Sequence, residues 1–402
     1  MIEERHVVVV GDGPAGAMVA AGLRDRDVPC VVVGPGERWT PTYGSWADDL
    51  ADCSVLGSAD IASQLVESVR FAALDEHDVA RPYLVVDNDR LATVLFAGVD
   101  RRIGRVCRIV PDAGGARVEL DDRTSLEASL VIDATGAGSE PDGRPPQQPM
   151  AWQTAWGVVL DEVPAGPLGR ATVMDWTSPG GVDESIPTFG YALPVADGWL
   201  VEETVLAAAP AVDPASLRPV LARRLGWSIA ELDERTRRVE RVHIPMGSPI
   251  VGQPPAGAPA VVRVGAASGL AHPATGYLVA PMARTVDRVA DAIAAARTEP
   301  VGVRAAQAWE AIWEPALRRT RAFHEFGLDV LLRLDADGTR QFFETFFSLP
   351  SDVWPHQMRV DTPPAQIAAL MLQMFRSAPW SLRRRLVSGD LRRLARVVRP
   401  AR

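Results

Sequence analysis

Residues 6–34 read HVVVVGDGPAGAMVAAGLRDRDVPCVVVG, an apolar run, a glycine turn, a stretch with helical spacing and a second apolar run. This order predicts a β-α-β unit. The turn places Gly11, Gly13 and Gly16 in the G-x-G-x-x-G spacing, so that backbone N–H groups at a helix N-terminus can approach a pyrophosphate without a Cβ in the way. Because the turn follows a strand and opens a helix, it predicts a dinucleotide-binding site.

One part of this dinucleotide pattern is missing. An acid that holds the ribose is expected about 20 residues after the turn, at the end of the second strand. Gly34 stands at that place, and the nearest carboxylate is Glu37. Either Glu37 reaches back to the ribose, or backbone groups hold it.

The composition predicts a globular protein with a large core. The 402 residues are 47% apolar and 23% charged, which is enough for two or three lobes. No apolar run reaches the roughly 20 residues of a membrane-spanning helix, and MIEERHVVVV has acidic flanks and no cleavage-site pattern, so we expect a cytoplasmic protein. The three cysteines, Cys30, Cys53 and Cys107, are too few and too widely spaced for a disulfide framework or a metal site.

Positive charge gathers at the C-terminal end of the chain. Residues 376–402 hold nine arginines and one acid, although the net charge is −9. This basic segment follows the apolar stretch IAALMLQMF at residues 367–375. The combination predicts peripheral contact with the anionic inner face of the cell membrane. Leu370, Leu372 and Phe375 are expected to lie in the membrane interface. The alternative is an ordinary solvated helix, and no pattern indicates nucleic-acid binding.

The rest of the chain predicts an α/β fold. A strand-like run, SLVIDATGAGS, ends in a small-residue turn at residues 134–136. Short strand-like pieces with Pro and Gly turns between them then predict an inserted antiparallel sheet, which commonly covers the substrate-binding site. We therefore expect a Rossmann-like dinucleotide-binding part, the inserted sheet, a return to the first part, and a helical C-terminal region. Their expected bounds are 1–150, 151–245, 246–300 and 301–402.

Two carboxylates stand side by side in the strand-like segment GWLVEETVL, residues 198–206. Burying either charge is costly unless the group is paired, protonated or used in chemistry. Adjacent side chains of a strand point to opposite faces, so Glu202 shares a face with Leu200 and Thr204 while Glu203 lies on the other. In a regular strand, only one of the two glutamates can enter a given pocket.

Several stretches together resemble the lycopene cyclase family of FAD-dependent carotenoid β-cyclases over nearly the whole chain. These stretches are GDGPAG at 11–16, YGSWADDL at 43–50, FGYALPV at 189–195, LVEET at 200–204, GLAHPATGYLVA at 269–280 and FGLDVLLRLDADGTRQFFETFFSL at 326–349. The resemblance implies conversion of the acyclic ends of lycopene, or of a related hydrophobic polyene, to β-ionone rings. It also implies bound FAD in its reduced form, with an external reductant such as NAD(P)H.

The implied ring closure needs a proton donor, a dry pocket for a cation and a proton acceptor. A glutamate stays protonated near neutral pH when an apolar setting and a second carboxylate raise its pKa. By resemblance to the family motif, Glu202 is the acid and Glu203 its partner or the base, while Asp48 and Asp49 match a family acid pair that could also be a surface turn. The faces of Trp46, Trp152, Trp156 or Trp199 could stabilise the cation.

A set of main-chain turns and small residues is expected around the flavin. His272 is expected beside the flavin, although a lone histidine is more often structural, and the turn at Gly276 is suited to face the electron-rich edge of a reduced flavin. The expected cofactor-binding residues are Gly11, Gly13, Pro14, Ala15, Gly16, Glu37, Ala134, Thr135, Gly136, His272, Pro273, Thr275, Gly276 and Tyr277.

Two other functions fit parts of the sequence. The first is an FAD-dependent monooxygenase of the aromatic-hydroxylase type, but such enzymes usually carry an acid where Ala266 follows Gly265, and a D-G pair where Ala134 follows Asp133. Both departures favour the cyclase. The second is a non-catalytic flavoprotein that binds carotenoids or other lipids, against which the EET and HPATGY motifs argue.

Overall fold

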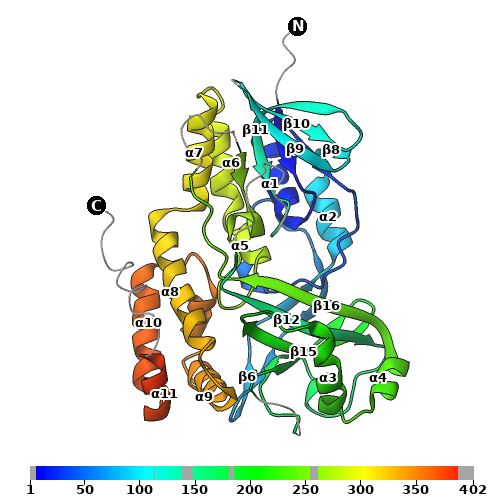
Figure 1. The fold of residues 1–402 in the computed structure, drawn as a ribbon, viewed down its shortest axis with the longest axis vertical. Helices are drawn as coiled ribbons and strands as arrows, with labels where there is room; N and C mark the ends of the chain where they lie inside the picture. The colour runs from blue at the N-terminus through cyan, green and yellow to red at the C-terminus, as the bar shows by residue number, and fades with distance from the viewer. Residues whose placement is uncertain (1–5, 113, 138–147, 181–184, 254–260, 388–402) are drawn as a thin grey trace.

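The computed structural model describes residues 6–112, 114–137, 148–180, 185–253 and 261–387. Its fold is mixed α/β, as expected, and is built on two seven-stranded sheets and one three-stranded sheet. Figure 1 shows the first sheet with its helices at the top, the second sheet below it, and α8–α11 along the left side. Within the described residues, every helix is too short or too polar to cross a bilayer.

The first sheet runs in the order β8-β2-β1-β11-β10-β9, with β17 paired to β11. Its parallel strands are β1 (His6–Val10), β2 (Cys30–Gly34), β8 (Asp100–Ile103), β11 (Ser125–Asp133) and β17 (Val261–Arg263). The antiparallel strands at one edge are β9 (Val106–Asp112) and β10 (Gly115–Leu120).

The valine run at the start of the chain is buried on both faces of this sheet. Val7 and Val9 pack with one face's helices, and Val8 and Val10 pack toward β9 and β10. This double burial is typical of a central parallel strand, and it confirms the predicted β-α-β unit. The helices of this layer are α1 (Pro14–Arg24), α2 (Asn88–Phe96), α5 (Val279–Ala283), α6 (Val286–Ala295) and α7 (Val301–Ile312).

The second sheet runs in the order β16-β12-β15-β14-β13-β5-β6. Its strands are β16 (Thr236–Met246), β12 (Ala151–Leu160), β15 (Gly198–Ala208), β14 (Phe189–Val195), β13 (Thr172–Asp175), β5 (Val69–Ala72) and β6 (Glu76–Val79). All neighbours are antiparallel except β13 and β5, which are parallel. The inserted antiparallel sheet is therefore present.

Two of the expected part boundaries do not match the strand and helix packing. The segment 69–79 was expected in the first part, but β5 and β6 extend the second sheet through pairing with β13. The segment 301–312 was expected in the C-terminal region, but α7 packs on α6 and on β17 of the first layer. The first difference arises from the long-range pairing of β5 with β13, which local patterns do not encode.

The remaining elements cover the two faces of the second sheet. One face packs against α3 (Arg218–Leu225) and α4 (Ile229–Arg235), and the other meets the aromatic side of α9. The small sheet, β3 (Gly44–Trp46), β7 (Tyr83–Val86) and β4 (Ala62–Val66), lies against that second face. The C-terminal helices are α8 (Pro315–Leu331), α9 (Ala336–Phe347), α10 (Pro364–Ser377) and α11 (Trp380–Leu386).

Candidate active site

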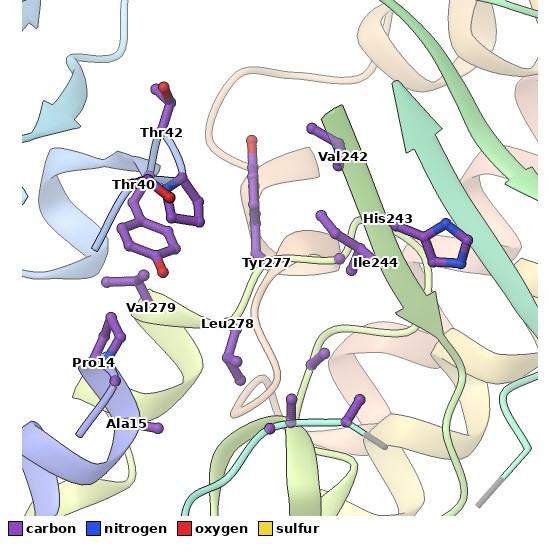
Figure 2. Close-up of a pocket in the computed structure, with 18 of the residues that line it drawn as sticks. Pro14, Ala15, Thr40, Thr42, Val242, His243, Ile244, Tyr277, Leu278 and Val279 are labelled. Atoms are coloured by element: carbon purple, nitrogen blue, oxygen red, sulfur yellow. The ribbon is translucent and has the colours of Figure 1, made fainter. Parts of the chain in front are cut away.

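A cavity of about 1270 Å³ connects the glycine turn of the first layer to the second sheet. One end is lined by the turn before α1 and by the turn after β11, and the other by Leu200, Met174 and Phe189. Figure 2 shows Pro14 and Ala15 on one side, Val242 and Ile244 of β16 on the other, and Tyr277 between them. One continuous space therefore joins the expected cofactor site to an apolar wall.

The glycine turn is shaped for a close approach by a ligand. Gly11 has φ of 107°, and a Cβ there would lie 2.5 Å from the carbonyl oxygen of Ala134. A Cβ on Gly16 would collide with the carbonyl oxygen of Gly11, whereas the space beside Gly13 and Gly136 is open. Helix α1 begins at Pro14 without a side-chain cap, so its N-terminus is available to an anion. These residues fit a dinucleotide pyrophosphate.

The structure brings most of the expected cofactor-binding residues to the cavity. The expected residues that line it are Gly11, Gly13, Pro14, Ala15, Ala134, Thr135, Gly136, Thr275, Gly276 and Tyr277. Gly16 lies one residue behind this lining, where it permits the close contact with Gly11. Glu37 does not line the cavity: its side chain is 70% exposed and its carboxylate lies 2.7 Å from Arg105.

His272 and Pro273 lie outside the cavity lining. The His272 ring is buried, its centroid is 4.2 Å from that of His324, and burial lowers the pKa of His272 to about 3. Its Nδ1 accepts from the backbone N–H of Ala274 at 3.2 Å, so Nε2 carries the proton and donates to the carbonyl oxygen of Gln357 at 3.2 Å. The neutral histidine thus fixes the loop that carries Thr275 and Tyr277.

Glu202 lies in the wall of the cavity, on the face of β15 that it was expected to share with Leu200 and Thr204. It pairs in register with Gly157 of β12 and with Tyr191 of β14. A Cβ on Gly157 would lie 2.7 Å from Oε1 of Glu202, so the glycine leaves the space that this carboxyl group occupies. Burial, followed by the charge of Glu240, raises the pKa of Glu202 to about 8. This carboxyl group is therefore protonated at neutral pH.

Glu240 is the second carboxylate of the cavity wall, and the sequence analysis missed it. It also pairs with Gly157, from β16 on the opposite side of β12. The backbone N–H and the hydroxyl of Thr42 donate to its two oxygens, each at 2.7 Å, and Arg238 lies 3.1 Å away. These partners hold the carboxylate of Glu240 in place. Glu240, and not Glu203, is therefore the second carboxylate whose charge helps to raise the pKa of Glu202.

Glu203 faces the other side of the sheet, so the structure does not bring the two adjacent glutamates together. It is fully buried under α3, where Nε and Nη2 of Arg224 donate to its carboxylate at 2.6 and 2.8 Å. A charge held in this way is a structural ion pair. The expected role of Glu203 as partner or base therefore has no support in its position.

Asp48 and Asp49 lie in a short 3-10 turn after β3, outside the cavity lining. Asp48 is exposed and lies 2.9 Å from Arg81. Asp49 is buried between Arg284 at 3.0 Å and Arg81 at 3.3 Å, and burial raises its pKa against the opposing effect of these arginines. The pair forms an ion network with Arg81 and Arg284 at the end of β3.

All four tyrosines of the chain line the cavity, which the sequence did not reveal. The hydroxyls of Tyr83 and Tyr277 lie 3.3 Å apart, and burial raises the pKa of Tyr83, Tyr191 and Tyr277 well above 10. These rings therefore stay neutral beside Glu202. Of the four tryptophans considered as cation-stabilising groups, only Trp152 lines this cavity.

Comparison with known proteins assigns nearly the whole chain to one family. Residues 6–384 match the family model described as "Lycopene cyclase protein". The chain is 33% identical to the chloroplastic lycopene beta cyclase of an Oncidium hybrid cultivar, over 87% of this chain and 76% of that protein. It is 28% identical to the lycopene beta cyclase of Synechococcus elongatus, over 96% of this chain and 97% of that protein.

Solved structures share the fold at low sequence identity. A geranylgeranyl bacteriochlorophyll reductase-like protein from Thermoplasma acidophilum superposes with a TM-score of 0.66 at 16% identity, covering 94% of this chain and 98% of its own. HpxO from Klebsiella pneumoniae, solved in complex with FAD, superposes with a TM-score of 0.56 at 18% identity, covering 94% of this chain and 100% of its own. The family match and the sequence relatives together decide the assignment: this chain is an enzyme and belongs to the lycopene cyclase family.

Proposed function

We propose that this enzyme converts the acyclic end groups of lycopene, or of a related linear polyene, to β-ionone rings without net oxidation or reduction. The observation that carries the proposal is Glu202, a buried acid with a pKa of about 8 in the wall of a largely apolar cavity. The relatives found by sequence bear the name lycopene beta cyclase. The monooxygenase alternative gains nothing from the solved structures, which support the fold alone.

The reaction needs only one proton in and one proton out. Glu202 in its acid form donates a proton to the terminal double bond of the polyene, which leaves a tertiary cation. The electron pair of a nearby double bond then forms the ring-closing carbon–carbon bond and moves the cation into the ring. A ring proton returns to the Glu202 carboxylate, which forms the ring double bond and restores the acid. Atoms and electrons balance, so the product is an isomer of the substrate.

The cavity wall suits a cationic intermediate. The neutral rings of Tyr83, Tyr191 and Tyr277 offer π faces and no strong nucleophile. The carboxylate of Glu240 lies across Gly157 from the acid and would favour positive charge in the same region. Leu200 and Phe189 exclude water, which would otherwise trap the cation as an alcohol.

We propose FAD as the cofactor of this reaction. Its pyrophosphate would lie at the glycine turn and the N-terminus of α1, and its ring system near the turn that holds Thr275, Gly276 and Tyr277. Reduced FAD, maintained by an external reductant such as NAD(P)H, would supply negative charge beside the cation. The FAD bound to HpxO, which shares the fold, supports this choice.

Peripheral membrane contact through α10 and α11 is the second part of the proposal. Leu372, Trp380 and Val387 are 47%, 72% and 54% exposed, although such apolar side chains favour burial. Trp380 begins α11 and Val387 follows its last residue, and their spacing of seven residues places them on one side of the helix, with Arg383 and Arg384 between them at helical spacing. Leu370, expected in the interface, is instead buried in the core. This surface would face anionic lipids on the cytoplasmic side of the cell membrane.

The test is turnover of lycopene by the purified protein. The FAD-loaded, reduced protein is incubated with lycopene in lipid vesicles, and the product is analysed by mass spectrometry and NMR of its end groups. We expect β-ionone rings at unchanged mass. A product heavier by one oxygen atom would support a monooxygenase instead, and unaltered lycopene would contradict the proposal. The number of ends closed is read from the same spectra.

A further inference from the structure

The expected ribose-binding acid is absent at the end of β2, where Gly34 stands. In a dinucleotide-binding β-α-β unit, a carboxylate at this place accepts hydrogen bonds from the ribose hydroxyls. Gly34 lines the cavity, so the ligand can reach this position. Some other group must therefore hold the ribose, or the site lacks that contact.

Asp12 occupies the space that a side chain at position 34 would fill. A Cβ added to Gly34 would collide with the carboxyl group of Asp12, including Cγ and Oδ1. Asp12 is the residue between the first two glycines of the turn, and it also lines the cavity. The carboxyl group of Asp12 therefore lies where the side chain of a strand-end acid would lie, and Gly34 leaves room for it.

The Asp12 carboxylate is held in place by its neighbours. The backbone N–H of Gly36 donates to Oδ2 at 2.8 Å, and Arg101 lies 3.5 Å from the same oxygen. The indole N–H of Trp39 donates to the backbone carbonyl of Asp12 at 2.8 Å. Within the described part of the chain, no hydrogen bond reaches Oδ1. One carboxylate oxygen is anchored, and the other is available to a ligand.

Glu37, the nearest acid by sequence, does not offer this arrangement. Its carboxylate is exposed, pairs with Arg105 and lies outside the cavity lining. Position therefore separates the two candidates, because Asp12 lines the cavity and Glu37 does not.

We propose that Asp12 binds the adenosine ribose hydroxyls of the dinucleotide, in place of the acid that usually stands at the end of the second strand. The inference rests on the proposed FAD cofactor. A carboxylate at this place prefers free hydroxyls and repels a 2′-phosphate, so the ligand is a dinucleotide with an unmodified ribose.

The test is a double-mutant cycle read by FAD affinity. Apoprotein is titrated with FAD and, separately, with FMN, which lacks the adenosine half, and flavin fluorescence gives each dissociation constant. Asp12→Gly should weaken FAD binding about tenfold or more, because a charged hydrogen bond is lost. Gly34→Asp alone should also weaken it, because the two carboxyl groups collide. The double variant Asp12→Gly, Gly34→Asp should recover most of the affinity.

Three controls keep the result interpretable. Glu37→Gln should leave FAD affinity unchanged, and Asp12→Gly should leave FMN affinity unchanged. Asp12→Asn keeps the shape of the side chain and should weaken FAD binding even if Asp12→Gly folds poorly. Loss of FAD affinity in Glu37→Gln instead of the Asp12 variants would overturn the inference, as would a double variant no better than the single ones. A wild-type protein that binds no FAD would overturn the proposed cofactor as well.

Discussion

Glu202 and Glu240 lie on the same face of the second sheet, on either side of Gly157, which pairs with both. The two glutamates come from different strands, β15 and β16. Strand β12 lies between them, and its residue at this position, Gly157, has no side chain. Because Gly157 has no side chain, the protonated Glu202 and the anchored carboxylate of Glu240 can share one cavity wall. Burial first, and then the charge of Glu240, raise the pKa of Glu202 to about 8, which keeps this glutamate an acid near neutral pH.

Gly157→Ala should displace the acid. The added Cβ would lie 2.7 Å from Oε1 of Glu202, so the carboxyl group must move away from its present position. We expect cyclisation to fall by roughly ten- to a hundredfold with FAD binding retained, because small displacements of a reacting group are costly. The matched control is Gly327→Ala in α8, where a Cβ meets nothing within 4 Å. Equal rates for both variants would show that Gly157 does not position Glu202.

Glu240→Gln should shift the pH dependence of cyclisation. The acid form of Glu202 is present below its pKa of about 8, so activity should fall as the pH rises through that value. Removing the neighbouring negative charge lowers the pKa of Glu202, so the loss of activity should occur at a lower pH. The pH profile of kcat measures this shift. Asp48→Asn, at an exposed site outside the cavity, should leave the profile in place; an unmoved profile in Glu240→Gln would contradict the assigned role.

Stability should depend on pH through Glu202. Its pKa is about 8 in the folded state, against an ordinary value of 4.5. Between these values the unfolded state releases the proton that the folded state keeps, so the free energy of unfolding falls as the pH rises. Glu202→Gln should remove this loss and become more stable than wild type at pH 8 to 9. Denaturant unfolding at several pH values measures the effect, and parallel curves for variant and wild type would contradict it.

Membrane binding should depend on the exposed apolar side chains of α10 and α11. Replacing Leu372 and Trp380 with serine removes apolar area from the proposed contact, so binding to anionic vesicles should weaken severalfold. Higher salt should weaken the wild-type binding too, because it screens the arginines. Val163→Ser, at an exposed site in the loop after β12, is the matched control. Unchanged sedimentation of the double variant with vesicles would leave α10 and α11 as an ordinary solvated surface.

The parts of the fold that local patterns encode were predictable from the sequence. The valine run, the glycine turn and the strand-like pieces between residues 150 and 241 identified the β-α-β unit and the inserted sheet. The period of two along β15 also predicted that Glu202 and Glu203 face opposite sides. Strands β5 and β6 were missed as members of the second sheet, because the pairing of β5 with β13 joins segments about a hundred residues apart.

The site residues that the sequence did not predict are placed by strand register and by long-range contacts. Glu240 meets Glu202 only because β16 and β15 align with the same residue of β12, and sequence does not give strand register. Arg224, which pairs with Glu203, comes from α3. The sequence did show an acid in the glycine turn, Asp12, together with a glycine at the strand end, Gly34. Only the short distance between these two residues in the structure indicates that Asp12 can take the place of the ribose-binding acid.

The measurement that tests the account most directly compares Glu202→Gln with Glu203→Gln at equal FAD occupancy. Glutamine keeps the shape of a protonated glutamate but cannot give up the proton, so Glu202→Gln should bind FAD and lose at least about 10²-fold in cyclisation. Glu203→Gln leaves Arg224 buried without its carboxylate and should lower the free energy of unfolding by about 3 to 5 kcal/mol. The fraction of Glu203→Gln that folds should still cyclise lycopene. Normal turnover by Glu202→Gln, with or without loss in Glu203→Gln, would contradict the assignment of Glu202 as the acid.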